Sequence, residues 1–497
     1  MNILLINIPS RRGKGGMNLP LGFLYVGGII ERSGHSVEIL DPYRYDPNLI
    51  SFDKADYSEI EKKINDYCPK IIGFGGIASS YGRTKKISEY LYQKYPDIIQ
   101  IAGGPLASVF ELILTKTRIN LVFHGETEIT LPEFLEKFEK NENWRTISGI
   151  SYFEGNTVLR NPMAPQIENL DLIPYPAYHL VNVEEYLTHV SGTFEAFRED
   201  SGENFDANAI LQKIGKGGKL FPVMTARGCT HKCSFCYRHM KGYRQHSVPY
   251  VINHIKHLMS HYAIRGFDIS DELFNFKKEW IMEFCNALEQ EKLDIYYRIS
   301  GARVDRIDRE ILQRLKETGC FYISYGEESG SDIILKEYRK GVSAQQNKDI
   351  PLLTKEVGLI NPMEILIGSP GETQKTIKET IQLLIDNSAV NPSINYLIPF
   401  PETPIWQYAM DNRLIPDIEK FLDEVAERGG APIVNLTHVP DRVWLSWYSQ
   451  ITNELKLNRY RHKGMMVHYF ILYPFIKIFN LMNPYIPRKF IASLKGR

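Results

Sequence analysis

The first 145 residues alternate between short apolar runs and longer stretches with helical spacing. Residues 2–8, NILLINI, are continuously apolar, which is typical of a strand buried on both faces. Residues 20–34 have helical spacing and end at Gly34, a typical helix stop. The alternation predicts further strands at residues 35–41, 70–77, 98–105 and 119–126, with helices around 83–95 and 128–140. This pattern indicates a doubly wound, Rossmann-like parallel sheet, which binds ligands at the carboxyl ends of its strands.

A second alternation of strands and helices begins at residue 221. The strand candidates are residues 221–226, 266–270, 294–300, 320–326, 361–368 and 393–399. Six such units predict a partial (β/α)6 barrel with its site at the carboxyl ends of the strands. We therefore expect an α/β protein with a sheet domain at 1–145, a connector at 146–220, the barrel at 221–410 and a mainly helical region at 411–497.

The connector and the C-terminal region carry weaker patterns. Residues 147–162 predict a small β-hairpin, and residues 190–220 a polar, glycine-containing loop. Residues 440–464 predict an amphipathic helix, because Val443, Trp447, Ile451 and Leu455 recur at helical spacing.

The last residues are apolar, aromatic and basic. No acidic residue follows Glu454, and the longest uncharged run, 464–476, is too short to span a bilayer. We expect residues 460–497 to make peripheral contact with an anionic membrane surface. The alternative is a C-terminal element docked on the barrel with a basic rim.

Composition narrows the classes of function. The chain has 59 basic and 59 acidic residues, so net charge gives no reason to expect nucleic-acid binding. The N-terminus lacks the basic start of a secretory signal, and we expect a cytoplasmic protein. Thiols stay reduced there, so clustered cysteines indicate metal binding or catalysis. The isolated Cys68, Cys285 and Cys320 are expected to be buried structural thiols.

Three cysteines follow the first barrel strand, as Cys229-x3-Cys233-x2-Cys236. A zinc ion needs four ligands, and His239 or His231 could complete a Cys3His site. A [4Fe–4S] cluster normally takes four cysteines, so three would leave one iron open to a substrate or cofactor. Spacing alone leaves both hypotheses open.

The cysteine spacing, with an aromatic residue just before Cys236 and at the end of a first barrel strand, resembles the radical S-adenosylmethionine (SAM) superfamily. Residues 267–274 (FDISDELF), 298–341, 364–373 (EILIGSPGET) and 396–409 resemble further barrel segments of that superfamily. The resemblance implies that the three cysteines hold a [4Fe–4S] cluster whose fourth iron binds SAM. It also implies that the aromatic residue contacts SAM and that two acids lie near the amino group of SAM. An arginine is expected at the carboxylate of SAM, and further residues are expected near its ribose. The residues of this predicted SAM site are Phe235, Asp271, Glu272, Arg303, Glu328, Ser329 and Gly368.

The N-terminal half resembles the cobalamin (B12)-binding domain of B12-dependent radical enzymes, over residues 20–41, 71–108, 123–136 and 170–178. This resemblance implies a cobalamin site made by Gly22, Gly75, Gly76, Ser79, Gly103, Gly104, Gly125 and Glu126. The D-x-H-x-x-G signature is absent, and Leu106 stands where a histidine is often seen. We therefore expect no histidine ligand to cobalt from this domain. A domain that has lost cobalamin is the alternative.

Together the two resemblances imply methylation of an unactivated carbon through a 5′-deoxyadenosyl radical and methylcobalamin. The basic, apolar tail favours a lipid or other hydrophobic small-molecule substrate. A radical cyclisation or rearrangement without methyl transfer is the alternative within the class, and a zinc-stabilised ligand-binding protein is the alternative outside it. A one-electron reductant such as flavodoxin or ferredoxin is the expected partner. The sequence assigns no catalytic acid or base.

Overall fold

The structure is a computed structural model that describes residues 1–8, 19–42, 57–188, 220–389, 391–428, 431–462, 474–475 and 478. The predicted loop at 190–220 and the tail at 460–497 lie almost entirely outside the described residues.

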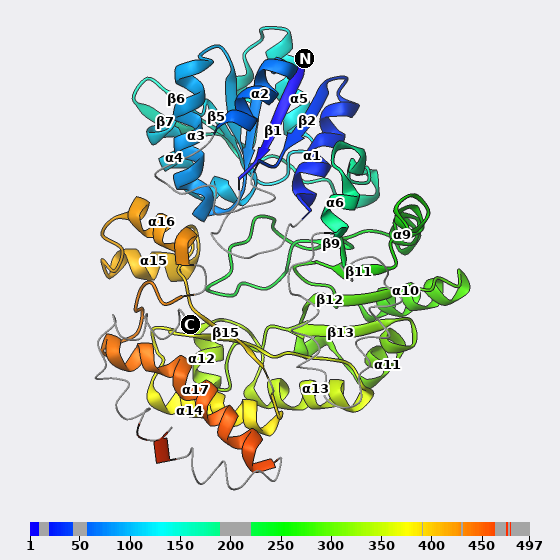
Figure 1. Ribbon diagram of the computed structural model, residues 1–497, viewed down its shortest axis with the longest axis vertical. Coiled ribbons are helices and arrows are strands. Elements are labelled where there is room, and N and C mark those ends of the chain that lie inside the picture. Colours follow the sequence, from blue (N-terminus) through cyan, green and yellow to red (C-terminus); the bar gives the residue numbers. More distant parts are fainter. Residues whose placement is uncertain are drawn as a thin grey trace.

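The N-terminal sheet has five parallel strands in the order β2-β1-β3-β4-β5 (Figure 1). Its strands are β1 (Asn2–Asn7), β2 (Ser36–Leu40), β3 (Ile71–Gly75), β4 (Ile99–Ala102) and β5 (Leu121–Phe123). Its helices are α1 (Leu21–Arg32), α2 (Ser58–Tyr67), α3 (Tyr81–Lys94), α4 (Phe110–Lys116) and α5 (Thr130–Glu139). The apolar strands are buried between these helices, as continuous apolar runs predict.

The predicted hairpin is present and belongs to this sheet. Strands β6 (Ile150–Glu154) and β7 (Thr157–Arg160) form it, and β6 pairs antiparallel with β5. A short helix, α6 (Val183–Thr188), precedes the part of the connector that the structure leaves undescribed.

The barrel strands are parallel and follow one another in space. Strands β8 (Phe221–Val223), β11 (Gly266–Ile269), β12 (Tyr296–Ala302) and β13 (Cys320–Tyr325) form one sheet, and β14 (Glu364–Ile367) and β15 (Ser393–Tyr396) another. A parallel bridge between Glu328 and Ile365 links the two sheets. The helices are α9 (Val248–Tyr262), α10 (Lys278–Gln290), α11 (Arg309–Glu317), α12 (Asp332–Glu337), α13 (Ala344–Val357) and α14 (Gln374–Asp386). The six predicted strands are all observed.

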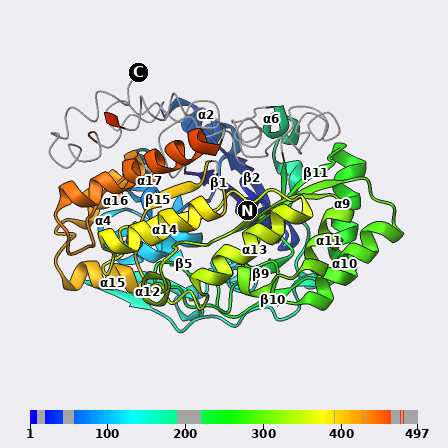
Figure 2. The same ribbon diagram turned by 90° about the horizontal axis from the view of Figure 1, so that it is seen from below.

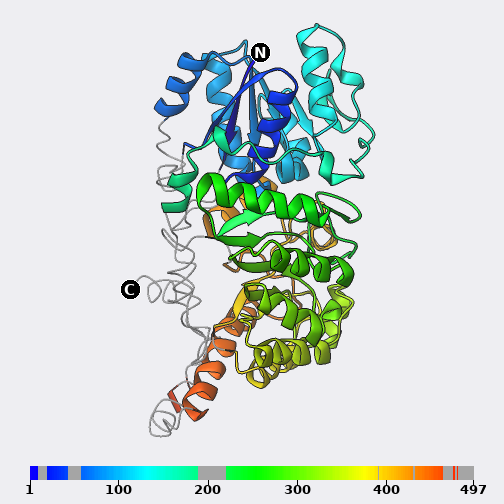
Figure 3. The ribbon, with the colours of Figure 1, turned by 90° about the vertical axis from the view of Figure 1, so that its right-hand side faces the viewer.

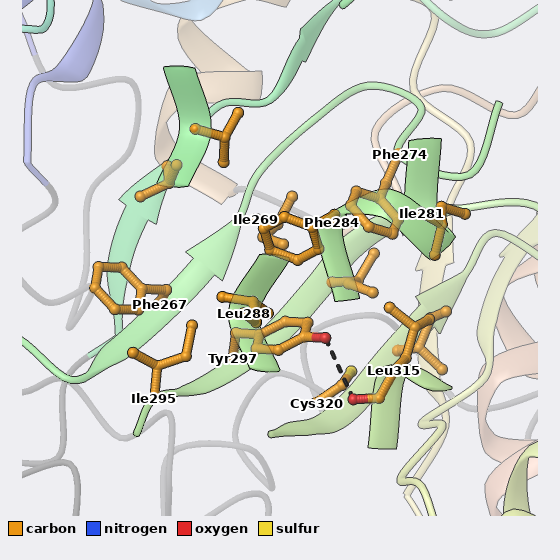
Figure 4. Packing of buried hydrophobic residues seen from close by; sticks show 14 of the residues in the cluster. Phe267, Ile269, Phe274, Ile281, Phe284, Leu288, Ile295, Tyr297, Leu315 and Cys320 are labelled. Atoms are coloured by element: carbon orange, nitrogen blue, oxygen red, sulfur yellow. Dashed lines mark hydrogen bonds between the residues drawn. The ribbon is translucent and has the colours of Figure 1, made fainter. Parts of the chain in front are cut away.

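One face of the barrel strands packs against these helices (Figures 2 and 4). Phe267, Ile269 and Tyr297 contact apolar side chains of α10 and α11, and the Tyr297 hydroxyl donates a hydrogen bond to the Leu315 carbonyl at 3.2 Å. Because side chains alternate along a strand, the intervening residues point to the opposite, inner face.

The C-terminal helices contact both the barrel and the N-terminal domain. They are α15 (Pro404–Asp411), α16 (Ile418–Arg428) and α17 (Asp441–His462). Side chains of α15 and α16 share an apolar cluster with the N-terminal sheet, and α17 packs along α14 (Figures 1 and 3). The predicted amphipathic helix is α17, where Trp447, Ile451 and Leu455 are buried as expected and Val443 is only partly buried. Within the described residues, no helix is both long and apolar enough to cross a membrane.

Candidate active site

A cavity of about 300 Å³ lies between the carboxyl edge of the N-terminal sheet and the segment after the first barrel strand. All but one of the residues predicted to bind cobalamin line this cavity. They are Gly22, Gly75, Gly76, Gly103, Gly104, Gly125 and Glu126. The exception, Ser79, is buried in a short 3-10 helix at Ala78–Ser80. Residues from four separate segments of the chain thus meet at one edge of the sheet.

Part of the cavity wall is apolar. Leu5, Ile101 and Leu131 line it, and a Cβ atom at Gly73 would lie only 2.7 Å from Leu5 Cδ2. A side chain larger than that of glycine at position 73 would therefore displace Leu5. The apolar lining, together with the glycines that let a ligand approach the backbone, fits a large cofactor such as cobalamin.

The three cysteines lie on a loop, residues 228–243, that we call the cysteine loop. Its two ends are paired by β9 (Ala226–Arg227) and β10 (Arg244–Gln245). Gly228 has a φ of +80°, and a Cβ there would lie 2.5 Å from the Gly242 carbonyl oxygen. Since L side chains rarely adopt this conformation, glycine is required where the two ends meet.

The cysteine loop is also held at its middle. The Ser234 amide donates to the Tyr338 carbonyl at 2.9 Å, and its own carbonyl accepts from the Ile405 amide at 3.0 Å. The Phe235 ring packs edge-on against the Tyr338 ring, with centroids 5.1 Å apart. Phe235, a predicted SAM contact, therefore also anchors the loop to the end of α12.

Two of the three thiols have raised pKa values. Desolvation, with smaller contributions from the Cys233, Glu272 and Cys229 side chains, raises the pKa of Cys236 to about 12. Desolvation also raises the pKa of Cys233, against the opposing effect of the Lys340 ammonium. Such thiols become good ligands once a metal replaces the proton.

No group of three His, Cys, Asp or Glu side chains among the described residues is placed to hold a single metal ion. Zinc requires four ligands around one point, whereas each thiolate of an iron–sulfur cluster binds a different iron. His239, one of the two histidines considered for a zinc site, lines the cavity and bonds to the Gly125 backbone. His231 lies beside Cys229, with Nδ1 3.7 Å from Sγ. The donor set fits a three-cysteine cluster better than a Cys3His zinc site.

The two predicted acids after β11 have different environments. Asp271 is buried and accepts hydrogen bonds from the Thr225 amide at 2.7 Å, the Ala226 amide at 3.0 Å and the Thr225 hydroxyl. Burial nevertheless raises its pKa to about 6. Asp271 thus fixes the segment that leads into the cysteine loop. Glu272 is exposed and is the acid whose charge reaches Cys236.

Arg303 and Glu328 lie near the cysteine loop and are joined through Lys340. The Arg303 guanidinium bonds to Asp305 at 2.8 Å and to the Lys340 carbonyl at 2.7 Å, and the Lys340 ammonium lies 2.9 Å from Glu328. The sequence did not single out Lys340, although this residue lies within residues 298–341, a stretch that resembles the superfamily.

Ser329 and Gly368 have structural partners instead. The Ser329 hydroxyl lies 3.2 Å from the Thr380 hydroxyl and accepts a hydrogen bond from the Ser331 amide at 3.1 Å. Gly368 donates its amide to Glu372 and faces Trp444, whose Nε1 would lie 2.9 Å from an added Cβ.

Glu126 lines the cavity, but its carboxylate already has partners. Arg244 contacts both of its oxygens, at 2.6 and 2.8 Å, and Arg227 lies 3.3 Å away. Arg227 also pairs with Glu128 at 2.5 Å. Burial would raise the pKa of Glu126, but Arg244 and Arg227 outweigh it and hold that pKa below its usual value. No pattern in the sequence signals this pairing, because the partners are about a hundred residues apart.

The structure is that of an α/β protein in which the carboxyl edge of a doubly wound sheet and the three-cysteine loop of a partial barrel line one cavity. Residues 15–135 match the B12 binding domain and residues 223–384 the Radical SAM superfamily. The chain is 28% identical to an uncharacterized methyltransferase of Pyrococcus horikoshii, over 84% of each chain. It is 22% identical to an anaerobic magnesium-protoporphyrin IX monomethyl ester cyclase of Cereibacter sphaeroides, over 81% of this chain and 62% of that one.

A solved structure shares the fold. The radical SAM methyltransferase TsrM of Kitasatospora setae, with cobalamin and a [4Fe–4S] cluster bound, matches with a TM-score of 0.65 at 17% identity, over 82% of this chain and 75% of that one. The chain thus contains a B12 binding domain followed by a domain of the Radical SAM superfamily. These domains imply a [4Fe–4S] cluster, SAM and cobalamin as its cofactors.

Proposed function

We propose that this protein is a B12-dependent radical SAM methyltransferase that acts on an unactivated carbon. The observation that carries the proposal is the cavity, because glycines of the sheet edge and residues of the cysteine loop line the same space. A methyl donor held by the sheet would then face a substrate held by the barrel. The relatives named as methyltransferases support the same reaction.

Within this proposal, Cys229, Cys233 and Cys236 hold the cluster, and Glu272, Arg303 and Glu328 surround SAM. When bound, the cluster and SAM supply a radical that abstracts hydrogen, and cobalamin supplies a methyl group. The chain's part is to exclude water and hold the groups in place: Asp271 and Tyr338 fix the cysteine loop, and Lys340 compensates the charge of Glu328.

Anaerobic incubation of the reconstituted protein with SAM carrying a deuterated methyl group tests the reaction. The protein is supplied with a cell extract and a one-electron donor such as flavodoxin or ferredoxin, and products are measured by mass spectrometry. We expect a product that gains the label together with 5′-deoxyadenosine. If 5′-deoxyadenosine forms and no product carries the label, the methyltransferase proposal is wrong.

Formation of 5′-deoxyadenosine without a labelled product would favour a radical cyclisation or rearrangement. The specific observation behind this candidate is the similarity to the magnesium-protoporphyrin IX monomethyl ester cyclase. A colourless, zinc-containing protein from anaerobic purification would instead support the ligand-binding alternative.

The inner face of the barrel favours a substrate whose reacting part is polar. Arg298 Nη2 lies 2.6 Å from Asp268, which also accepts from the Ser300 hydroxyl at 2.6 Å, and the Ser324 hydroxyl donates to Glu364 at 2.5 Å. Desolvating such groups against an acyl chain would be costly. We therefore propose that polar groups flank the carbon that reacts, even in a substrate with the hydrophobic character that the tail suggested.

We further propose that residues 460–497 contact an anionic membrane surface. The support is the apolar and basic sequence, since the structure leaves nearly all of this tail undescribed. Flotation with anionic liposomes tests it, comparing the full chain with one that ends at residue 459. Equal recovery of both proteins in the soluble fraction would contradict the proposal.

A further inference from the structure

Four buried charged side chains join the N-terminal domain to the base of the cysteine loop. Glu126 and Glu128 follow β5, Arg227 lies on β9 and Arg244 on β10. Their side chains are between 5% and 8% exposed, and each carboxylate contacts at least one guanidinium. We call these four residues the clasp. Two acids and two bases make it neutral overall.

The clasp constrains the orientation of the cysteine loop as well as its distance from the N-terminal domain. Arg244 contacts both oxygens of Glu126, and a bidentate pair of this kind constrains the orientation of both groups. The same guanidinium donates to the Ile167 carbonyl at 2.6 Å, and the Arg227 guanidinium lies 5.2 Å from the centre of the Tyr25 ring. Because both ends of the cysteine loop carry a clasp arginine, a shift of the loop would break buried ion pairs.

The clasp also forms part of the cavity. Glu126, Glu128 and Arg227 all line it. Glu128 Oε2 is buried and has no hydrogen-bond partner among the described residues. A ligand with amide or hydroxyl donors, such as the side chains of a corrinoid, offers a partner for that oxygen.

We infer that the clasp couples the two cofactor sites, so that a corrinoid bound in the cavity orders the cysteine loop. The inference rests on the proposed function, in which the cavity holds cobalamin. The four residues are positioning residues, since they act on the thiols through the loop. Coupling is reciprocal, so an assembled cluster raises the affinity for cobalamin by the same factor by which cobalamin raises the affinity of the loop for the cluster.

Hydrogen exchange on the full-length protein, with and without hydroxocobalamin under anaerobic conditions, tests the coupling. In the wild type we expect amides of residues 228–243 to exchange about tenfold more slowly with hydroxocobalamin, a typical coupling strength. Arg244→Lys keeps the positive charge and loses the bidentate contact with Glu126. We expect that variant to bind hydroxocobalamin and to lose most of the slowing in the cysteine loop.

The matched control is Glu402→Gln. It removes an ion pair between Arg160 and Glu402 that also joins the N-terminal sheet to the barrel, at 3.3 Å, but whose side chains are 40% and 37% exposed. We expect this control to retain the wild-type slowing, because an exposed pair constrains little.

A second variant covers the case in which Arg244→Lys does not fold. Glu128→Gln keeps the size of the side chain and an oxygen for Arg227, and places an N–H donor where the cavity has an acceptor. We expect it to weaken the slowing as well. The same slowing in the wild type and in both clasp variants would overturn the coupling. Failure of the wild type to bind hydroxocobalamin would overturn the proposed cobalamin site first, and the coupling with it.

Discussion

The carboxyl edges of the N-terminal sheet and of the barrel have the same parallel topology but are lined by different kinds of residue. Each lies at the carboxyl ends of parallel strands. Apart from Glu126, Thr127 and Glu128, the edge of the N-terminal sheet consists of glycines and apolar side chains, so we expect its specificity to come mainly from shape. The edge of the barrel carries thiols, buried acids and cations, so its specificity comes from chemical groups. We expect larger side chains to impair ligand binding at the edge of the N-terminal sheet. At the barrel edge we expect the loss of functional groups to impair it.

The largest effect should come from removing the thiols of the barrel edge. We expect Cys229→Ala/Cys233→Ala/Cys236→Ala to abolish iron binding and 5′-deoxyadenosine formation, because the cluster loses all of its proposed ligands. Iron analysis and absorbance after anaerobic reconstitution measure this loss. The control is Cys68→Ser, since Cys68 is exposed, contrary to the buried position expected from the sequence. Iron retained by the triple variant would mean that the cluster lies elsewhere.

A buried acid of the barrel edge should make stability depend on pH. Burial raises the pKa of Glu327 to about 8, and only one of its oxygens has a partner, the Glu364 amide at 2.7 Å. Its folded pKa exceeds the unfolded value, so the folded state keeps the proton longer. Stability is therefore full below about pH 4.5 and falls as pH rises towards 8, on the order of 3–5 kcal/mol in total.

Replacing this acid should remove that dependence. We expect Glu327→Gln to be more stable than the wild type at pH 8 and similar near pH 5, as measured by urea unfolding at both values. The exposed Glu279→Gln provides the control and should keep the wild-type slope. Parallel pH profiles for Glu327→Gln and the wild type would show that this acid does not carry the effect.

Adding atoms should damage the edge of the N-terminal sheet. Gly103 has extended backbone, and a Cβ there makes only an ordinary contact of 3.5 Å with Phe123. Gly103→Leu should therefore fold and fill part of the cavity. We expect hydroxocobalamin affinity to fall about 10- to 100-fold, which corresponds to ~1–3 kcal/mol of overpacking. Equilibrium titration followed by absorbance measures it, and iron content should not change. Unchanged affinity would place the corrinoid elsewhere.

The smallest effect should come from the most open position on the same edge. Gly22 lies in the first turn of α1, and a Cβ there would meet no atom within 4 Å. Gly22→Ala should stabilise the helix by up to ~1 kcal/mol, since alanine favours helix over glycine. Thermal unfolding should show a small increase in Tm, with cobalamin affinity nearly unchanged. A large loss of affinity would mean that the ligand contacts this turn closely.

Much of the architecture was predictable because local patterns encode it. The continuous apolar run at residues 2–8 became β1, all six barrel strands appeared, and the predicted hairpin formed. Its attachment to β5 was not predictable, since an antiparallel edge strand leaves no local mark that distinguishes it from a free hairpin. Most glycines of the cavity were predictable for a similar reason, because Gly75, Gly76, Gly103, Gly104 and Gly125 lie at or just after the ends of strands of a parallel sheet.

The partners of the site residues were not predictable. Glu126 was expected at cobalamin and is paired with Arg244, Asp271 holds the Thr225 segment, and Ser329 bonds to Thr380. Each partner is between about 46 and 118 residues away in the chain.

The sequence by itself determined the two α/β units and a three-cysteine loop at the head of the second. Periodic burial and ligand spacing are local properties, so they can be recognised in a single chain. Only the tertiary structure decided that the loop faces the glycine edge and that buried ion pairs hold it there. Those contacts depend on how distant segments pack, and a buried charge is stabilised only when the packing brings a partner of opposite charge to it.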